Sequence, residues 1–174
     1  FKYIILIMIV TNSTYVIFDY NKKTDIFNWK IINDAVMGGK SKSTFYLNEE
    51  GEGTFEGTVS TENNGGFSFL RHRFEKLNIS EFSTILLQIK GDGKKYQFRM
   101  KSNKYDQHSY VADFQTTNKW QLLEIPLAEF APTFRGRKLN MDKYNGEQVE
   151  EIGFLIGNKS NEQFKLLIKS ISFK

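Results

Sequence analysis

The chain of 174 residues has no cysteine, only two prolines and only two histidines. Without cysteine there can be no disulfide, no zinc–thiolate site and no cysteine nucleophile. The histidines, His72 and His108, show neither a nucleophile motif nor a paired metal-ligand spacing. His72 lies between Arg71 and Arg73, so we expect an exposed ring whose pKa is lowered by positive neighbours. We therefore predict a protein that is not an enzyme and has no metal site and no cofactor.

Neither sign of charge is in large excess. The net charge is +4, from 24 basic and 20 acidic residues, and no run of five like charges occurs. This pattern does not favour nucleic-acid binding. Hydrophobic residues make up 40% and charged residues 25%, which is typical of a globular chain. The 16 Phe and 8 Tyr favour strands, and the length fits one domain.

Two other kinds of catalytic signature have little support. Glycoside hydrolysis needs two carboxylates across a cleft, and the candidates Asp34, Glu62 and Asp113 come from different segments. The sequence leaves open whether they converge. Residues 91–95 lack the spacing of a phosphate-binding loop, so we interpret them as a turn.

The first 14 residues differ in character from the rest. Lys2 precedes an apolar run, residues 3–10, that is much shorter than the roughly 20 residues of a membrane-spanning helix. A basic residue followed by a short apolar block is typical of the front of a secretory signal. We assign residues 1–14 to a signal-like or anchor-like segment and 15–174 to one domain. An exported or membrane-associated protein is favoured, with the cytoplasm as the alternative.

Alternating apolar residues predict strands along most of the chain. The clearest case is residues 85–89, then Gly91-Asp92-Gly93, then residues 96–101. We predict a hairpin here, with an apolar inner face and a cationic outer face. Residues 127–130 are expected to form one helical turn, and residues 145–151 a short helix.

The fold class follows from the number of strands. About ten short strands, separated by turn signals, predict an all-β jelly-roll β-sandwich of two antiparallel sheets with one or two short helical turns. A closed up-and-down barrel is the alternative. The apolar phase changes between Ile168 and Ile171, which predicts a β-bulge.

Residues 33–41 combine polar, apolar and glycine residues in a way that a simple connecting loop does not require. Asn33 and Asp34 can hydrogen-bond nearby backbone, Val36-Met37 is apolar, and Gly38-Gly39 permits positive φ. A second asparagine–glycine turn occupies residues 61–66. The two loops are interpreted either as a structural lock or as a ligand pocket.

Other binding candidates are an arginine and several aromatic residues. Arg135 follows Pro132 in an irregular segment and could clamp a carboxylate or backbone carbonyls, or act as a structural lock. Outward-facing aromatic side chains could stack on a sugar or anchor a protein, although most are expected in the core. The aromatic candidates are Trp29, Trp120, Tyr96, Tyr105 and Tyr110.

Several motifs in a shared order resemble the complex I intermediate-associated protein 30 family. They are Trp29, residues 33–41, 55–60 and 63–68, Gly91-Asp92-Gly93 with Tyr96, Trp120 with Ile125-Pro126, residues 132–136, and residues 152–156. The resemblance covers roughly residues 15–174. It implies a jelly roll similar to galactose-binding-like domains and carbohydrate-binding modules, and a non-catalytic role like that of respiratory complex I assembly factors.

These observations give one leading hypothesis and two alternatives. The leading hypothesis is a chaperone-like assembly or stabilising factor that binds a protein, such as a subunit of a membrane complex. The alternatives are a carbohydrate-binding module and a small-ligand domain, and the oligomeric state stays undetermined. The candidate binding or loop-locking residues are Asn33, Asp34, Met37, Gly38, Gly39, Ser41, Asn63, Asn64, Gly65, Gly66, Phe67 and Arg135.

Overall fold

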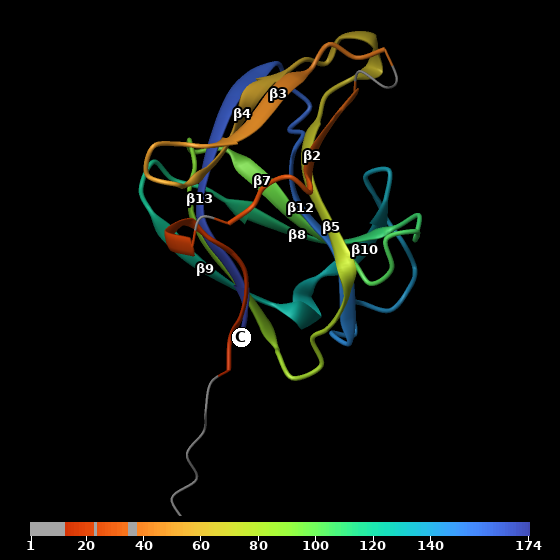
Figure 1. The fold of residues 1–174 in the computed structure, drawn as a ribbon. Coiled ribbons are helices and arrows are strands. Elements are labelled where there is room, and N and C mark those ends of the chain that lie inside the picture. Colours follow the sequence, from red (N-terminus) through yellow and green to blue (C-terminus); the bar gives the residue numbers. More distant parts are fainter. Residues whose placement is uncertain (1–12, 23, 35–37) are drawn as a thin grey trace, which may run out of the picture.

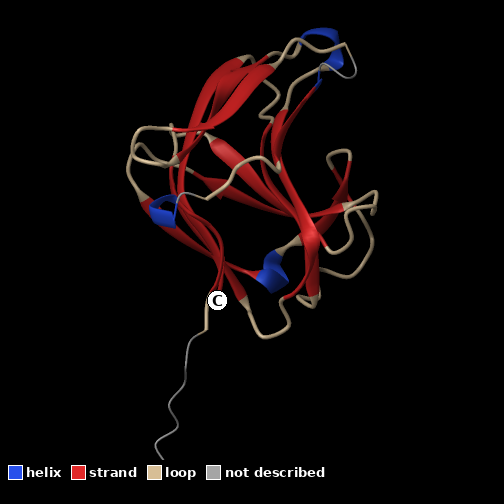
Figure 2. Cartoon of the chain, in the orientation of Figure 1, coloured by secondary structure: helices blue, strands red, loops and turns tan. Residues whose placement is uncertain are grey.

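Two antiparallel β-sheets pack face to face in the computed structural model, which describes residues 13–22, 24–34 and 38–174 (Figures 1 and 2). The predicted jelly-roll sandwich is confirmed, and the barrel alternative is wrong because the strands divide into separate sheets. The helical elements among the described residues are short 3-10 turns: η1 (Tyr20–Lys22), η3 (Glu62–Asn64) and η4 (Leu127–Glu129).

One sheet has six strands in the order β3-β4-β13-β6-β9, with β1 also paired to β13. The last strand in sequence lies in the middle of this sheet because its first half pairs with β4 and its second half with β1, while β6 runs along its other side. The strands are β1 (Tyr15–Asp19), β3 (Lys42–Leu47), β4 (Gly53–Val59), β6 (Thr84–Lys90), β9 (Gln121–Pro126) and β13 (Glu162–Phe173).

The other sheet has seven strands in the order β11-β10-β8-β7-β12-β5-β2. Here too a late strand, β12, lies between strands from earlier in the chain, which is what makes the topology non-local. The strands are β2 (Trp29–Asn33), β5 (Ser68–Asn78), β7 (Lys95–Lys101), β8 (Ser109–Gln115), β10 (Ala131–Phe134), β11 (Arg137–Lys138) and β12 (Gln148–Ile156).

The core lies between the inner faces of the sheets, as the alternating pattern requires. Tyr96, Phe98 and Met100 are buried on β7, and Phe98 and Phe154 meet edge to face with ring centroids 5.0 Å apart. Phe164 of the six-stranded sheet packs against Tyr96 of the seven-stranded one. The apolar inner face predicted for residues 96–101 is therefore confirmed.

The predicted hairpin at residues 91–93 is wrong. β6 belongs to the six-stranded sheet and β7 to the seven-stranded sheet, so this turn connects the two layers. A turn signal predicts reversal of the chain but not which strands pair. The N–H of Gly91 donates to the carbonyl of Thr117 (3.1 Å), which ties the turn to the next connection.

The two helical predictions have different outcomes. The turn at residues 127–130 is confirmed by η4, whereas the helix at 145–151 is wrong because β12 begins at Gln148. Tyr144 donates its hydroxyl hydrogen to the Gln148 carbonyl (2.5 Å), and β12 gains strand partners on both sides. Tertiary pairing therefore outweighs the weak local preference. The predicted β-bulge is confirmed by a register shift between Ile168 and Ser170.

No helix among residues 13–22, 24–34 and 38–174 is long and apolar enough to cross a bilayer. The signal-like segment lies almost entirely outside the described residues, which begin at Ser13.

Candidate functional site at the glycine loops

Asp34 is the centre of the candidate site. It follows β2, and its side chain is buried, with 2% of the residue exposed. Its Oδ2 accepts hydrogen bonds from the Ser41 hydroxyl (2.5 Å), the Gly66 N–H (2.5 Å) and the Phe67 N–H (3.3 Å), while Oδ1 accepts one from the Ser41 N–H (3.0 Å). The carboxylate thereby joins the loop after β2 to the loop before β5.

These hydrogen bonds determine the charge state of Asp34. Burial by itself would raise the pKa of this carboxyl group. The Ser41 hydroxyl and the N–H groups of Gly66, Ser41 and Phe67 outweigh burial and hold the pKa of Asp34 below its ordinary value. Asp34 is therefore an anion near neutral pH, with its main acceptor positions already occupied.

Neighbouring hydroxyl and amide groups extend the network. Ser41 Oγ accepts a hydrogen bond from the Ser60 N–H (3.0 Å), which attaches the end of β4 to the same loop. Asn33 Oδ1 accepts from the hydroxyls of Ser43 (3.0 Å) and Ser68 (2.8 Å). The ends of four strands, β2, β3, β4 and β5, are thus joined through polar side chains.

Glycine is required beside Asp34 because there is no room for a side chain. A Cβ at Gly39 would lie 2.2 Å from Asp34 Oδ1, and one at Gly65 would lie 2.5 Å from Oδ2. Gly38 and Gly66 have positive φ values of 86° and 129° and serve the turns instead. Two glycines therefore allow close approach to the carboxylate, and two allow the chain to reverse.

The outer end of the loops is exposed and projects from the top of the sandwich in Figure 1. Asn63 donates from Nδ2 to the Gly38 carbonyl (3.0 Å), and Lys40 forms an ion pair with Glu62. Asn63 and Asn64 have φ values of 54° and 60°, a region that asparagine tolerates better than most residues. We call the exposed residues Gly38, Lys40, Glu62, Asn63 and Asn64 the loop tip.

The predicted apolar plug, Val36 and Met37, lies outside the described residues. Phe67 contributes its backbone N–H to Asp34, and its side chain is half-buried. Of the twelve candidates, ten therefore lie in the two joined loops or at their strand ends: Asn33, Asp34, Gly38, Gly39, Ser41, Asn63, Asn64, Gly65, Gly66 and Phe67.

Arg135 is not near this group. It sits in the exposed turn between β10 and β11, at the opposite edge of the seven-stranded sheet from β2. Its φ is 47°, the following Gly136 has φ 77°, and its guanidinium carbon lies 5.3 Å from the Phe134 ring centroid. Arg135 occupies a hairpin turn. The order of the motifs along the chain did not show that the two glycine loops contact each other while Arg135 lies elsewhere.

His72 differs from expectation, because its ring is half-buried against aromatic side chains of the core. Its ring stacks on Trp29 with centroids 4.7 Å apart and an angle of 10°. Burial lowers the pKa of His72, and the contact with the Asn28 carbonyl (3.5 Å) partly opposes this. The lowered pKa was predicted, but burial is its cause instead of the flanking arginines, which project from the other face of β5.

The other chemical candidates are dispersed. Asp113 pairs with Lys95 on β7 (2.9 Å) and Glu62 with Lys40, so neither is aimed at Asp34. No group of three or more His, Asp or Glu side chains among the described residues could hold a metal ion. Trp29 and Tyr96 are buried, Tyr110 packs on Tyr144, and Tyr105 is 81% exposed.

Three serines in this network escaped sequence reasoning: Ser43, Ser60 and Ser68. Serine is common in strand ends and loops, and nothing local marks these three as partners of Asn33 and Ser41. They come together only because β2 pairs with β5 in one sheet, β3 pairs with β4 in the other, and the two sheets meet at this end.

The chain matches one known protein family over most of its length. The model of the family described as complex I intermediate-associated protein 30 matches residues 18–168. The chain belongs to this family. Both glycine loops fall within residues 18–168, so the candidate site lies inside the matched region.

The following curated relatives of this chain are distant in sequence, with identities of 28% or less. An uncharacterized protein of Schizosaccharomyces pombe is 28% identical over 83% of this chain and 76% of its own length. The mitochondrial complex I intermediate-associated proteins 30 of Drosophila melanogaster and Mus musculus are 24% and 23% identical over 72% and 94% of this chain. The matched regions span 50% and 57% of those two proteins, so this chain corresponds to about half of each.

Solved structures show the same fold. The family 11 carbohydrate-binding module of a Clostridium thermocellum cellulase superposes with a TM-score of 0.68 at 16% identity, covering 92% of this chain and 94% of the module. An exo-beta-agarase matches with a TM-score of 0.57 at 12% identity, over 92% of this chain and 25% of the enzyme. At these identities the likeness concerns the fold alone.

Proposed function

We propose that this family member is a non-catalytic domain that binds a protein partner, as an assembly or stabilising factor. The observation that carries the proposal is the use of Asp34. A candidate catalytic carboxylate accepts four internal hydrogen bonds and joins two loops, so its chemistry is structural. Two relatives are named complex I intermediate-associated proteins, which supports a respiratory-complex intermediate as partner and a mitochondrial location.

The loop tip is our proposed contact surface. The Asp34 network fixes its base, and the Asn63–Gly38 hydrogen bond and the Lys40–Glu62 ion pair connect its two halves. An exposed surface that is already ordered loses less conformational entropy when it binds. The two loops thus form a preorganised projection to which a partner protein can bind.

Exchanging the charges at the tip tests this assignment. The double variant Lys40→Glu/Glu62→Lys keeps an ion pair but inverts the charges presented to a partner. The matched control is Lys165→Glu/Glu56→Lys, which inverts a pair of 3.0 Å on the six-stranded sheet. We expect affinity capture from native cells to enrich a protein with the wild type and the control, and to lose it with the tip variant.

Two results would count against the proposal. If the wild type enriches no protein over a blank matrix, protein binding loses its support. If the tip variant captures the partner as well as the control does, the partner binds elsewhere and the tip assignment is wrong.

Carbohydrate binding is the second candidate, favoured by the fold shared with carbohydrate-binding modules. One related module was solved with a beta-1,3-1,4-mixed-linked tetrasaccharide, which is a suitable probe. Among the five aromatic candidates, Tyr105 presents the most exposed ring. Calorimetric titration with that tetrasaccharide should give no saturable heat if the protein-binding proposal holds. Nicotinamide and flavin nucleotides are the probes for the small-ligand alternative.

A further inference from the structure

The outer face of the seven-stranded sheet carries a row of cations around a glycine. On β12, Gly153 is paired with Arg71 of β5 on one side and with Arg99 of β7 on the other. Lys30 of β2 pairs with Arg71 and continues the row. With strands about 4.8 Å apart, the two arginine Cα atoms lie roughly 10 Å from each other.

The adjacent row adds two more cations. Glu151 is paired across the sheet with Arg73 on β5 and with Lys101 on β7. Arg73 Nε donates to Glu151 Oε2 at 2.6 Å, and Glu151 is 3% exposed. Five cations therefore share this part of the sheet with one carboxylate. We call them the basic face: Lys30, Arg71, Arg73, Arg99 and Lys101.

Arg99 is the least satisfied member of the basic face. It is half-buried, and its Nε hydrogen has no acceptor among the residues that the structure describes. Burial lowers the pKa of Arg99, and the negative charge of Glu151 only partly opposes this. A half-buried guanidinium without an anionic partner is costly for the free protein. The Nε atom itself is buried, so a carboxylate that reaches the exposed atoms of Arg99 would gain the strong hydrogen bond.

Arg71 has a similar position. Burial lowers the pKa of Arg71, and repulsion from Arg73 adds to this. Within the described part of the chain, neither Arg71 nor Arg99 forms an ion pair, because Glu151 is taken by Arg73. Other carboxylates are at the rim, where Glu150 accepts a hydrogen bond from the Lys104 N–H (3.0 Å).

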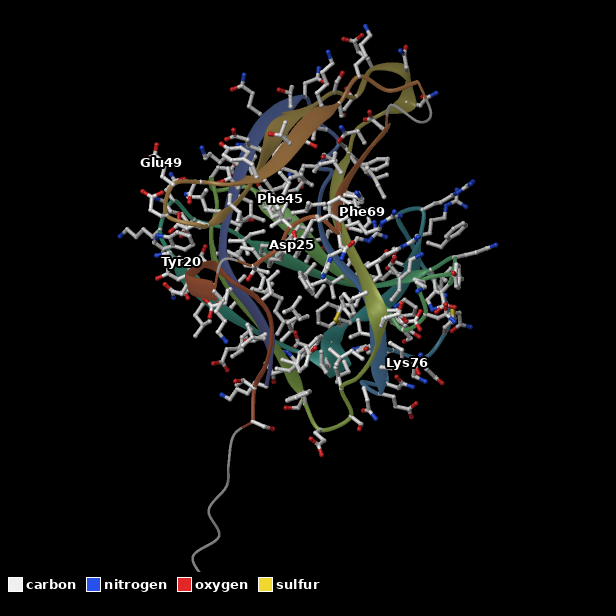
Figure 3. The ribbon with its side chains drawn as sticks, in the orientation of Figure 1. Tyr20, Asp25, Phe45, Glu49, Phe69 and Lys76 are labelled. Atoms are coloured by element: carbon white, nitrogen blue, oxygen red, sulfur yellow. The ribbon has the colours of Figure 1, made fainter. Side chains whose placement is uncertain are left out.

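The surroundings of the two arginines show what kind of anion fits. Phe69 and Leu155 form the row next to them, and Val111 pairs with Arg99 on the far side. Phe69 is labelled near the upper end of β5 in Figure 3, and its ring centroid lies 5.8 Å from the Arg99 guanidinium carbon. The ring therefore already has a stacking partner, which disfavours a sugar and leaves apolar contacts for a peptide.

We infer that the basic face seats a carboxylate-rich segment of a partner protein, with Arg71 and Arg99 receiving its acidic side chains. This inference rests on the proposed protein-binding function and names the chemistry of the partner. Tyr105, 81% exposed in the loop between β7 and β8, lies at the rim where Arg73 Nη2 donates to the Lys104 carbonyl (3.2 Å). Tyrosine and arginine are both enriched at protein interfaces.

Octaglutamate and octaglutamine peptides test the inference directly. We expect the full chain to bind fluorescent octaglutamate saturably, with an affinity that falls as salt is added, and not to bind octaglutamine. Amide shifts measured by NMR should move on β5, β7 and β12. Binding of both peptides alike, or shifts confined to other strands, would overturn the inference.

Single variants locate the site. Arg71→Gln and Arg99→Gln should each weaken octaglutamate binding about tenfold, since each removes a charge-assisted hydrogen bond. Lys165→Gln on the six-stranded sheet removes one charge elsewhere and should leave affinity within about twofold, because exposed charges that far away are screened. Arg71 is the less buried arginine, so Arg71→Gln decides the matter if Arg99→Gln fails to fold. Equal affinity of Arg71→Gln and Lys165→Gln would overturn the assignment.

Competition separates a carboxylate segment from other anions. Inorganic phosphate and the mixed-linked tetrasaccharide should not displace octaglutamate at millimolar concentration, and displacement by either would overturn the choice of ligand. The proposed function is judged independently by the capture experiment. If capture succeeds while octaglutamate fails, only the inference about the basic face is lost.

Discussion

Asp34 and Gly66 are 32 positions apart in sequence, and the Gly66 N–H donates to Asp34 Oδ2 at 2.5 Å. This hydrogen bond joins the loop after β2 to the loop before β5. Ser41 also donates its hydroxyl hydrogen to Asp34 and accepts from the Ser60 N–H, so the end of β4 is tied to the same carboxylate through one serine. Figure 1 shows the two connections meeting at the top of the molecule.

Removing the charge of Asp34 should destabilise the protein. We expect Asp34→Asn to lower the free energy of unfolding by about 1–3 kcal/mol, because an amide cannot accept with both of its terminal atoms. Urea denaturation followed by fluorescence measures the change. An Asp34→Asn variant as stable as the wild type would show that the network contributes little.

Acid should act on the same group. The pKa of Asp34 is lower in the folded chain than its ordinary value of 3.8, so the unfolded state takes up the proton first as pH falls. The stabilisation is therefore complete above about pH 5 and is lost as pH falls from about 4 through the folded pKa. Asp34→Asn should have a shallower loss of stability below pH 4. Parallel acid titrations of both proteins would contradict this.

The two close-approach glycines should be less tolerant than the turn glycine. Gly39→Ala and Gly65→Ala each place a Cβ within 2.5 Å of the Asp34 carboxylate, so we expect losses of about 2–3 kcal/mol or more. Gly38→Ala meets no atom within 4 Å and should lose only the roughly 1–2 kcal/mol of left-handed strain. Thermal unfolding of the three variants checks the ranking, and an equal loss in all three would contradict it.

The ion pair of Arg73 and Glu151, on β5 and β12 of the seven-stranded sheet, should contribute to stability. Arg73→Gln leaves Glu151, 3% exposed, without its partner, so we expect a loss of about 2 kcal/mol or more. Arg73→Gln/Glu151→Gln should recover part of that stability because the buried charge is gone. A double variant less stable than Arg73→Gln would show that Glu151 is held mainly by other groups such as Lys101.

Arg135 should be replaceable. Its φ of 47° favours glycine or asparagine, so Arg135→Gly should leave stability unchanged or raise it by up to about 1 kcal/mol. Partner capture should also be unchanged, since Arg135 lies far along the sheet from the loop tip. Loss of capture with intact stability would restore Arg135 as a binding residue.

Much of the fold could be predicted because it depends on local patterns. Alternation at residues 85–89 and 96–100 marks buried faces, and the phase change after Ile168 marks a bulge in one strand. The partners of those strands could not be predicted, since a turn at residues 91–93 is compatible with pairing in one sheet or with crossing between two. The expected helix at 145–151 failed for the same reason.

The candidate site shows a similar division. The glycine loops were found because Asn33, Asp34 and the paired glycines are unusual together, and the family resemblance placed both loops in order. Arg135 was grouped with them because it shares that order, but strand order puts it at the far edge. The basic face had a partial signal, since alternation predicted a cationic outer face on β7 only.

Side-chain chemistry and chain order were sufficient to determine the class of this protein: cysteine-free and strand-rich, with two glycine loops, one of which carries an aspartate. Tertiary structure decided what those features do. Hydrogen bonding from positions 41, 66 and 67 converts Asp34 from a possible ligand contact into a structural anion. Strand pairing places Arg71 and Arg99 on either side of Gly153, because residues distant in sequence become neighbours only when β5, β12 and β7 align.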